Sequence, residues 1–218
     1  MPVIGYIVLV LCAYLLGSIP TGYLVARAKG IDIRTVGSGN IGATNAFRVL
    51  GKPAGVVVLL VDALKGYAAC IWLTDLLIRI FELHPDNLVT ERAVAGFAAI
   101  LGHSFTCWLR FKGGKGIATS AGVYFAVALP AVVIALGSWI VFVLVTRFVS
   151  VGSIAAAVAL AAGVWATIGT HHSVALGIAT TVLGAMVIWK HKGNIARLGA
   201  GTESRVSFTK KSAEAGKP

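Results

Sequence analysis

A glycine-rich segment at residues 37–45, with the sequence Gly-Ser-Gly-Asn-Ile-Gly-Ala-Thr-Asn, contains the first side chains in the chain that could bind an anion. Glycine lets the backbone turn freely and approach a ligand closely, and successive backbone N–H groups in such a turn form a concave anion site. The residues that would take part are Gly37, Ser38, Gly39, Asn40, Thr44 and Asn45, followed by Arg48. A guanidinium suits phosphate or carboxylate, so this first polar segment predicts anion binding. An ordinary inter-helix loop with a helix cap is the alternative.

A second polar segment, residues 111–116, interleaves two lysines with three glycines. Its candidate phosphate-binding residues are Lys112, Gly113, Gly114, Lys115 and Gly116, and His103 precedes them by one predicted helix. A helix that starts near residue 117 would direct its positive end toward the same point. A Walker loop requires Ser or Thr after its lysine, whereas Gly116 follows Lys115 here, so nucleotide hydrolysis is not supported. The alternative is a basic interfacial loop that binds anionic lipid headgroups.

A third polar segment, residues 190–203, follows the last apolar run. If the helix continues, His191, Asn194 and Leu198 share one face. A histidine between two lysines favours its neutral form, which can accept a proton. Glu203 closes the segment, and a basic stop signal next to the membrane is the alternative reading.

Several other chemistries are excluded by residues that the sequence lacks. No histidine is followed by aspartate five positions later, which removes the His-x-x-x-x-Asp arrangement of acyltransferases that use coenzyme A thioesters. The sequence has no aspartate cluster for a metal-dependent phosphotransferase and no Gly-x-Ser-x-Gly motif for a lipase. We therefore expect no metal and no cofactor.

The elements that must position these segments are membrane helices. Of the 218 residues, 57% are hydrophobic and 12% are charged, whereas soluble domains have about 25% charged residues. Lipid is therefore the solvent for most of this surface. The formal net charge of +11 would suggest nucleic acid in a soluble protein, but we expect membrane lipid and no nucleic acid as a partner.

Seven apolar runs predict an all-α integral membrane protein with seven transmembrane helices. They cover residues 3–26, 54–78, 93–109, 117–129, 131–147, 151–169 and 173–190. Pro130 is expected to mark the turn between the fourth and fifth runs, because proline breaks a helix. One kinked helix over 117–147 is the alternative, and it would give six spans.

The charges predict the orientation. Sixteen of the 19 basic residues fall in segments that seven spans would place on one side, and the positive-inside rule makes that side cytoplasmic. The N-terminus is then outside and the C-terminus in the cytoplasm. We expect one catalytic transmembrane domain over 1–203 and a basic, disordered tail over 204–218. Within the second span, Asp62 and Lys65 are expected to form a structural ion pair.

Taken together and in this order, the three polar segments resemble the three motifs of the bacterial membrane acyl-phosphate:glycerol-3-phosphate acyltransferase family. The resemblance covers nearly the whole chain. It implies a multi-pass protein of the bacterial inner (cytoplasmic) membrane that moves an acyl group from acyl phosphate to the 1-hydroxyl of glycerol 3-phosphate. The products would be 1-acylglycerol 3-phosphate (lysophosphatidic acid) and phosphate, the first step of phospholipid synthesis. It also implies that neither a metal nor acyl-CoA is used, and that a soluble phosphate acyltransferase supplies the acyl phosphate.

The resemblance and the chemistry together suggest roles for the site residues. Arg48, Lys112, Lys115 and the glycines of the second polar segment would hold phosphate, and Ser38 with Asn40 would bind the acyl phosphate or its oxyanion. His191 and Asn194 would orient the attacking hydroxyl, and the base is either His191 or the phosphate of the substrate. The supporting residues would be Gly37, Gly39, Thr44, Asn45, His103 and Glu203.

Two other classes stay open. A transporter for a phosphorylated solute also needs phosphate-binding groups in a helical bundle, although transporters tend to bind near the midplane. A non-catalytic scaffold could bind anionic lipid through its basic face. The sequence leaves the acyl-chain preference and the oligomeric state undetermined.

Overall fold

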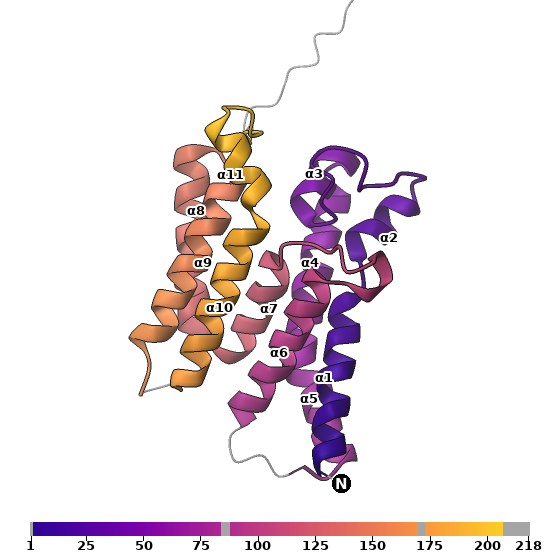
Figure 1. Cartoon of the computed structure of the whole chain (residues 1–218), viewed down its shortest axis with the longest axis vertical. Coiled ribbons are helices and arrows are strands. Elements are labelled where there is room, and N and C mark those ends of the chain that lie inside the picture. The colour runs from indigo at the N-terminus through magenta and orange to yellow at the C-terminus, as the bar shows by residue number, and fades with distance from the viewer. Residues whose placement is uncertain (1, 84–87, 170–172, 207–218) are drawn as a thin grey trace, which may run out of the picture.

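Long apolar runs without an interior proline form helices, because in lipid each backbone N–H must find its acceptor within its own segment. The computed structural model describes residues 2–83, 88–169 and 173–206, and these contain helices and loops but no β-strand (Figure 1). The elements are, in chain order, α1 (Pro2–Ser18), α2 (Thr21–Arg27), α3 (Ala43–Leu50), α4 (Lys52–Ala68), the π-helix η1 (Ala69–Leu73), α5 (Thr74–Ile80), α6 (Leu88–Ser104), the 3-10 helix η2 (Cys107–Leu109), α7 (Ile117–Val127), α8 (Leu129–Thr146), α9 (Val149–Ala166), α10 (Val174–Lys190) and α11 (Lys192–Gly199).

Four helical stretches of the described chain are long and apolar enough to cross a membrane: Val3–Arg27, Lys52–Ile80, Leu129–Thr146 and Val149–Ala166. A fifth is added if α10 and α11, which meet at 51°, count as one span. Large apolar side chains face outward, with Val145 78% and Val3 71% exposed. Such a surface fits lipid rather than water, so the chain is an all-helical, multi-pass membrane protein.

Residues 117–147 form two helices and not one kinked helix. The break lies at Ala128, whose φ of −153° and ψ of 63° are not helical. Pro130 was expected to mark the turn, but it lies in the first turn of α8, where its missing N–H costs no helical hydrogen bond. With 11 residues, α7 is about 17 Å long and does not match the hydrocarbon thickness of a bilayer.

Small residues let the helices touch through their backbones. A Cβ on Gly122 of α7 would lie 1.8 Å from the carbonyl oxygen of Ala63 in α4. One on Gly102 of α6 would lie 2.1 Å from the carbonyl oxygen of Tyr14 in α1. Contacts this close are typical of helix pairs in membranes. They hold α7 against α4, and α6 against α1.

The polar segments gather at one end of the molecule. Figure 1 shows α3, which contains the last residues of the first polar segment, and α11, which carries most of the third, at the end opposite to the one where α1 begins. A core beneath the first polar segment includes Ala26 of α2, Ile33 and Ile41 of the loop, Ala46 of α3 and Val58 of α4. This core fixes the loop to the bundle.

Candidate active site

Asn45 organises the first polar segment from the first turn of α3, where it is 1% exposed. Its Nδ2 donates to three carbonyl oxygens of the preceding loop: those of Ile33 (3.3 Å), Val36 (3.1 Å) and Asn40 (2.9 Å). Its Oδ1 accepts from the N–H of Ser38 at 2.9 Å. The amide of Asn45 is thus engaged in shaping the loop, and a supporting role of Asn45 at the site stays a prediction.

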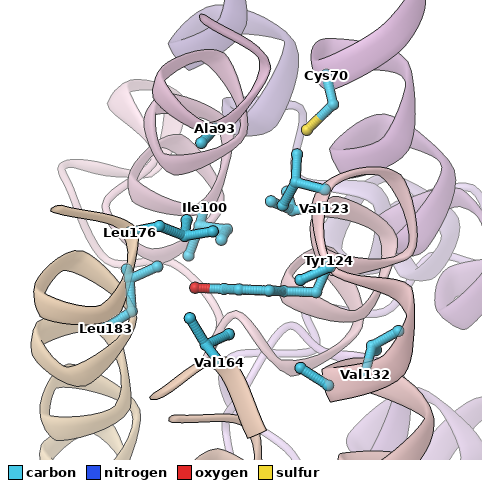
Figure 2. Close-up of a cluster of buried hydrophobic side chains, with 12 residues drawn as sticks. Cys70, Ala93, Ile100, Val123, Tyr124, Val132, Val164, Leu176 and Leu183 are labelled. Atoms are coloured by element: carbon cyan, nitrogen blue, oxygen red, sulfur yellow. The ribbon is translucent and has the colours of Figure 1, made fainter. Parts of the chain in front are cut away.

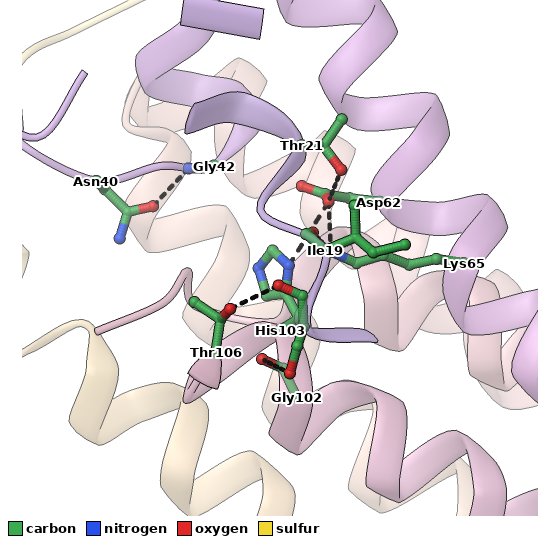
Figure 3. Close-up of polar contacts among 10 residues, drawn as sticks. Ile19, Thr21, Asn40, Gly42, Asp62, Lys65, Gly102, His103 and Thr106 are labelled. Atoms are coloured by element: carbon green, nitrogen blue, oxygen red, sulfur yellow. Dashed lines mark hydrogen bonds and ion pairs between the residues drawn. The ribbon is translucent and has the colours of Figure 1, made fainter. Parts of the chain in front are cut away.

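Other donors of the first polar segment stay available. The Oδ1 of Asn40 accepts from the N–H of Gly42 at 2.8 Å, which leaves its Nδ2 without a partner in the described chain (Figure 3). Ser38, Thr44 and Arg48 are exposed, and their side chains make no hydrogen bond within the described residues. These groups can bind a ligand without breaking a contact of the fold.

The glycines of the second polar segment pack on the C-terminal end of α6. The N–H of Gly113 donates to the carbonyl oxygen of Ser104 (3.2 Å), and that of Gly114 to the carbonyl oxygen of His103 (3.0 Å). A Cβ on Gly114 would lie 2.1 Å from Nε2 of His103, and one on Gly113 would lie 2.1 Å from the His103 carbonyl oxygen. Both amides therefore have backbone acceptors in the described chain, and the expected role of the two glycines in holding phosphate stays a prediction.

Gly116 turns the chain into α7. Its φ of +83° is left-handed, a conformation that glycine adopts without strain, and it precedes the first residue of the helix. The first helical bond runs from the N–H of Ser120 to the carbonyl oxygen of Gly116 at 2.7 Å. The N–H groups before it point out of the helix end beside Lys115, as the sequence predicted.

His103 belongs to a buried polar cluster that joins α2, α4 and α6. Its Nδ1 lies 3.6 Å from Oδ1 of Asp62, and the same oxygen lies 2.8 Å from Nζ of Lys65 and accepts from the hydroxyl of Thr21 at 3.0 Å (Figure 3). The predicted ion pair between Asp62 and Lys65 is thereby confirmed. His103, proposed as a supporting residue, touches Gly114 and supports the second polar segment from α6.

The third polar segment does not continue straight from α10. The chain bends by 51° at His191, and α11 carries Asn194 back toward the second polar segment. There, Nζ of Lys115 donates to Oδ1 of Asn194, a contact between residues 79 positions apart. The second and third polar segments therefore meet, as predicted.

Glu203 anchors this meeting point. Its carboxylate accepts from Nδ2 of Asn194 (2.6 Å), from the hydroxyl of Ser150 in α9 (2.8 Å) and from Nε of Arg197 (2.7 Å). Burial raises the pKa of a carboxyl group, but these hydrogen bonds hold the pKa of Glu203 below its ordinary value. Glu203 thus stays ionised and fixes the amide of Asn194 with its oxygen toward Lys115.

Burial changes the charge state of two residues in this region. It lowers the pKa of Lys115 to about 8, and the nearby Arg197 and Arg48 act in the same direction against Glu203. Burial and the Lys115 cation lower the pKa of His191 to about 4. His191 is therefore neutral near pH 7, as predicted, although the cation responsible is Lys115 and not its sequence neighbours.

The flanking lysines have other partners. Nζ of Lys190 donates to the carbonyl oxygen of Ser104 and lies 4.0 Å from the ring centroid of Phe105. Nζ of Lys192 lies 4.8 Å from the ring of Trp189. Lys190 thus ties the end of α10 to the end of α6.

The tautomer of His191 is set by its own helix. Nδ1 of His191 lies 2.8 Å from the carbonyl oxygen of Val187, and a carbonyl only accepts, so Nδ1 carries the proton. Nε2 is left as an acceptor. Ser38 and His191 share no hydrogen bond in the described chain, so a serine nucleophile with a histidine base is not assembled here.

The structure thus joins Lys115, Asn194 and Glu203 directly and brings Arg48 within electrostatic reach of Lys115. It shows Ser38 in contact with Asn45. Ser150 is a contributor that the sequence did not single out, because a hydroxyl among small residues is common where membrane helices pack. Among residues 2–83, 88–169 and 173–206, no three His, Cys, Asp or Glu side chains are grouped to hold a metal.

A multi-pass helical membrane protein with a cationic, anion-seeking site at one end is the class that this fold and site define. The family model for glycerol-3-phosphate acyltransferase matches residues 7–201. The chain therefore belongs to the glycerol-3-phosphate acyltransferase family, and it is an acyltransferase.

Curated relatives agree with this assignment. The glycerol-3-phosphate acyltransferase of Geobacter metallireducens is 48% identical over 204 residues, which cover 91% of this chain and 96% of the relative. That of Geotalea daltonii is 44% identical over 198 residues, again 91% of this chain and 96% of the relative.

Two solved structures have the same fold. The glycerol 3-phosphate form of PlsY (YgiH), an integral membrane glycerol 3-phosphate acyltransferase, is 38% identical, with a TM-score of 0.81 over 93% of this chain and 96% of that chain. The lysophosphatidic acid form is 37% identical, with a TM-score of 0.78 over 93% of this chain and 95% of that chain.

Proposed function

We propose that this protein moves an acyl group from acyl phosphate to the 1-hydroxyl of glycerol 3-phosphate, giving lysophosphatidic acid and phosphate. The observation that carries the proposal is the contact between Lys115 and Asn194, which brings a partly buried cation to the helix that follows a neutral histidine. Both substrates carry phosphate, and so does the lipid product. The crystallised forms of PlsY with glycerol 3-phosphate and lysophosphatidic acid support the same substrate and product.

An apolar groove begins next to this cation. It lies between α7, α8, α9 and α10 and encloses about 560 Å³, including the part open to the surroundings. Its lining residues nearest the cation are Ile117, two residues after Lys115, and Val187, one helical turn before His191, and we take this end as its mouth. A phosphate head at Lys115 would therefore leave the acyl tail of the donor in the groove. A solute transporter has no need of such a groove.

The reaction requires little of the protein beyond positioning its two substrates. The 1-hydroxyl oxygen of glycerol 3-phosphate attacks the acyl carbonyl carbon, the ester C–O bond forms, and the bond from that carbon to the phosphate oxygen breaks. The hydroxyl proton passes to the phosphate of glycerol 3-phosphate, a monoester whose second pKa is about 6, and from there to the departing phosphate, which leaves as hydrogen phosphate. With a pKa of about 4, His191 is the weaker base, so its Nε2 orients the hydroxyl and the phosphate takes the proton.

The binding roles of the other site residues are assigned from donor groups that can reach a ligand. Lys115, Arg48 and Lys112 bind phosphate together with the N–H groups at the start of α7. Ser38 and the free Nδ2 of Asn40 bind the acyl phosphate or its oxyanion. The protein acts in the bacterial inner membrane with seven spans and its site on the cytoplasmic side, where a soluble phosphate acyltransferase delivers acyl phosphate.

Purified protein given acyl phosphate and labelled glycerol 3-phosphate tests the proposal. We expect labelled lysophosphatidic acid from the wild-type protein and a loss of at least about a hundredfold for Lys115→Ala, since one charged transition-state contact is worth this much. Lys52→Ala is the matched control, because it removes an exposed cation at the start of α4 outside the site. Uptake of glycerol 3-phosphate into vesicles without lipid product would instead indicate a transporter. The absence of both product and uptake would indicate a scaffold.

A further inference from the structure

One aromatic side chain closes the deep end of the apolar groove. Tyr124 of α7 is 0% exposed, and Figure 2 shows its ring reaching from α7 to the space between Leu183 of α10 and Val164 of α9. Its hydroxyl donates to Oγ1 of Thr180 in α10 at 2.7 Å, and Oγ1 of Thr180 donates to the carbonyl oxygen of Leu176 at 2.7 Å. The ring is thus tied at both ends, by its backbone to α7 and by its hydroxyl to α10.

The depth of the groove follows from the helix that lines it. Ile117 at the mouth and Tyr124 at the floor are seven residues apart on α7, which is about 10 Å of helical rise. Beyond the ring the interior is filled: Ile100, Val123, Val164 and Leu176 are buried in one cluster with Tyr124. An acyl chain that enters at Ile117 therefore meets a wall at Tyr124.

We propose that Tyr124 is the floor of the acyl-chain groove and sets the longest acyl chain that the groove accepts. This inference rests on the proposed function, because it assumes that an acyl chain occupies the groove. The bond to Thr180 keeps the ring from rotating aside, so a longer chain cannot displace it without losing a buried hydrogen bond. The sequence did not indicate this role, because Tyr124 lies in an apolar run without a motif.

A comparison of acyl phosphates of different chain length tests the proposal. Each variant is given glycerol 3-phosphate and a homologous series of saturated acyl phosphates, and kcat/KM is compared between chain lengths within that variant. Tyr124→Ala should favour longer chains over the wild-type optimum by about fourfold for each methylene that gains burial. Tyr124→Phe keeps the ring but removes its bond to Thr180, so its optimum should move toward longer chains by less than that of Tyr124→Ala.

A second variant tests the same groove in the opposite direction. Ala121 lines the groove one helical turn nearer the mouth, and Ala121→Leu should shift the optimum to shorter chains. The ratio of kcat/KM values between two chain lengths does not depend on the fraction of the protein that is folded. A destabilised variant therefore still gives a valid chain-length preference. If Tyr124→Ala and Ala121→Leu both kept the chain-length preference of the wild type, the proposal that Tyr124 is the floor of the groove would be wrong. If instead the wild-type protein formed no lipid from any acyl phosphate, the proposed function would fail first.

Discussion

Lys115 carries its charge in surroundings unlike those of a surface lysine. It donates to Asn194, and burial lowers its pKa to about 8, with smaller contributions in the same direction from Arg197 and Arg48. The ammonium group is therefore close to losing its proton at mildly alkaline pH. A phosphate that binds there would restore the charge.

Substrate affinity should therefore fall on the alkaline side. Above pH 7 the phosphate of glycerol 3-phosphate is already fully ionised, since its second pKa is about 6. A rise of pH through about 8 then removes the proton from Lys115 and weakens binding. Isothermal titration with glycerol 3-phosphate between neutral and alkaline pH should show this loss in the wild-type protein.

Lys115→Arg provides the control for this titration. A guanidinium stays protonated throughout the range, so its affinity, although lower because the geometry differs, should change less with pH. Parallel pH profiles for the two proteins would mean that Lys115 does not cause the loss.

Sequence reasoning at this scale found the cation and its contact with Asn194, but it could not show how the glycines and Asn45 pack. Lys115, Asn194 and Arg48 stand out because a charged or amide side chain next to a membrane span has few structural uses. Gly113, Gly114 and Asn45 look the same in sequence whether they face a ligand or a neighbouring backbone. Only the packing on His103 and on the loop carbonyls decides between these uses.

The element that positions Lys115 is a loop pressed against the end of α6. Gly113 and Gly114 allow the close approach, and His103, held by Asp62 of α4, is the surface on which Gly114 rests. The loop is thus positioned from a buried polar cluster.

Gly114→Ala should displace this loop. The added Cβ would lie 2.1 Å from Nε2 of His103, so we expect a rise of at least about tenfold in the KM for glycerol 3-phosphate with a smaller change in kcat. Kinetics on the purified variant would measure this split. Gly137→Ala in α8 is the control, because a Cβ there meets no atom within 4 Å.

A double variant separates the clash from other effects. His103→Ala removes the ring that the new Cβ would meet, so Gly114→Ala with His103→Ala should be less damaging than the two single changes added together. Simple additivity would show that His103 does not position the loop.

The helices themselves could be expected from composition, because a lipid environment permits little else. The bends could not. The break at Ala128 and the bend at His191 involve residues without a helix-breaking side chain, and packing against neighbouring helices sets them. Pro130, the residue that suggested a break, stands one position inside the next helix.

For the whole molecule, the prediction is that all three polar segments lie on one side of the membrane. Exposed positions in or next to them are Thr35, Lys112 and Lys192, and Val174 is the first residue of α10. With the three native cysteines replaced, single cysteines at the first three positions should react with a membrane-impermeant reagent only from the cytoplasmic side. A cysteine at 174 should react only from outside.

If the first three positions were labelled from different sides of the membrane, the three polar segments could not form one site. The proposed reaction would then be wrong. The seven-span count depends on this experiment too, since α6 and α7 are shorter than the four clear spans. An odd number of crossings is required if α1 begins outside and α11 ends inside.

The bond between Lys115 and Asn194 also bears on how the protein is made. The amide that holds the cation lies beyond the last long apolar helix, and Glu203, which fixes that amide, comes later still. A chain emerging from the ribosome therefore carries its phosphate-seeking lysine long before the residues that steady it. If these contacts build the site as proposed, we expect acyl transfer only from a chain whose final helix is in place.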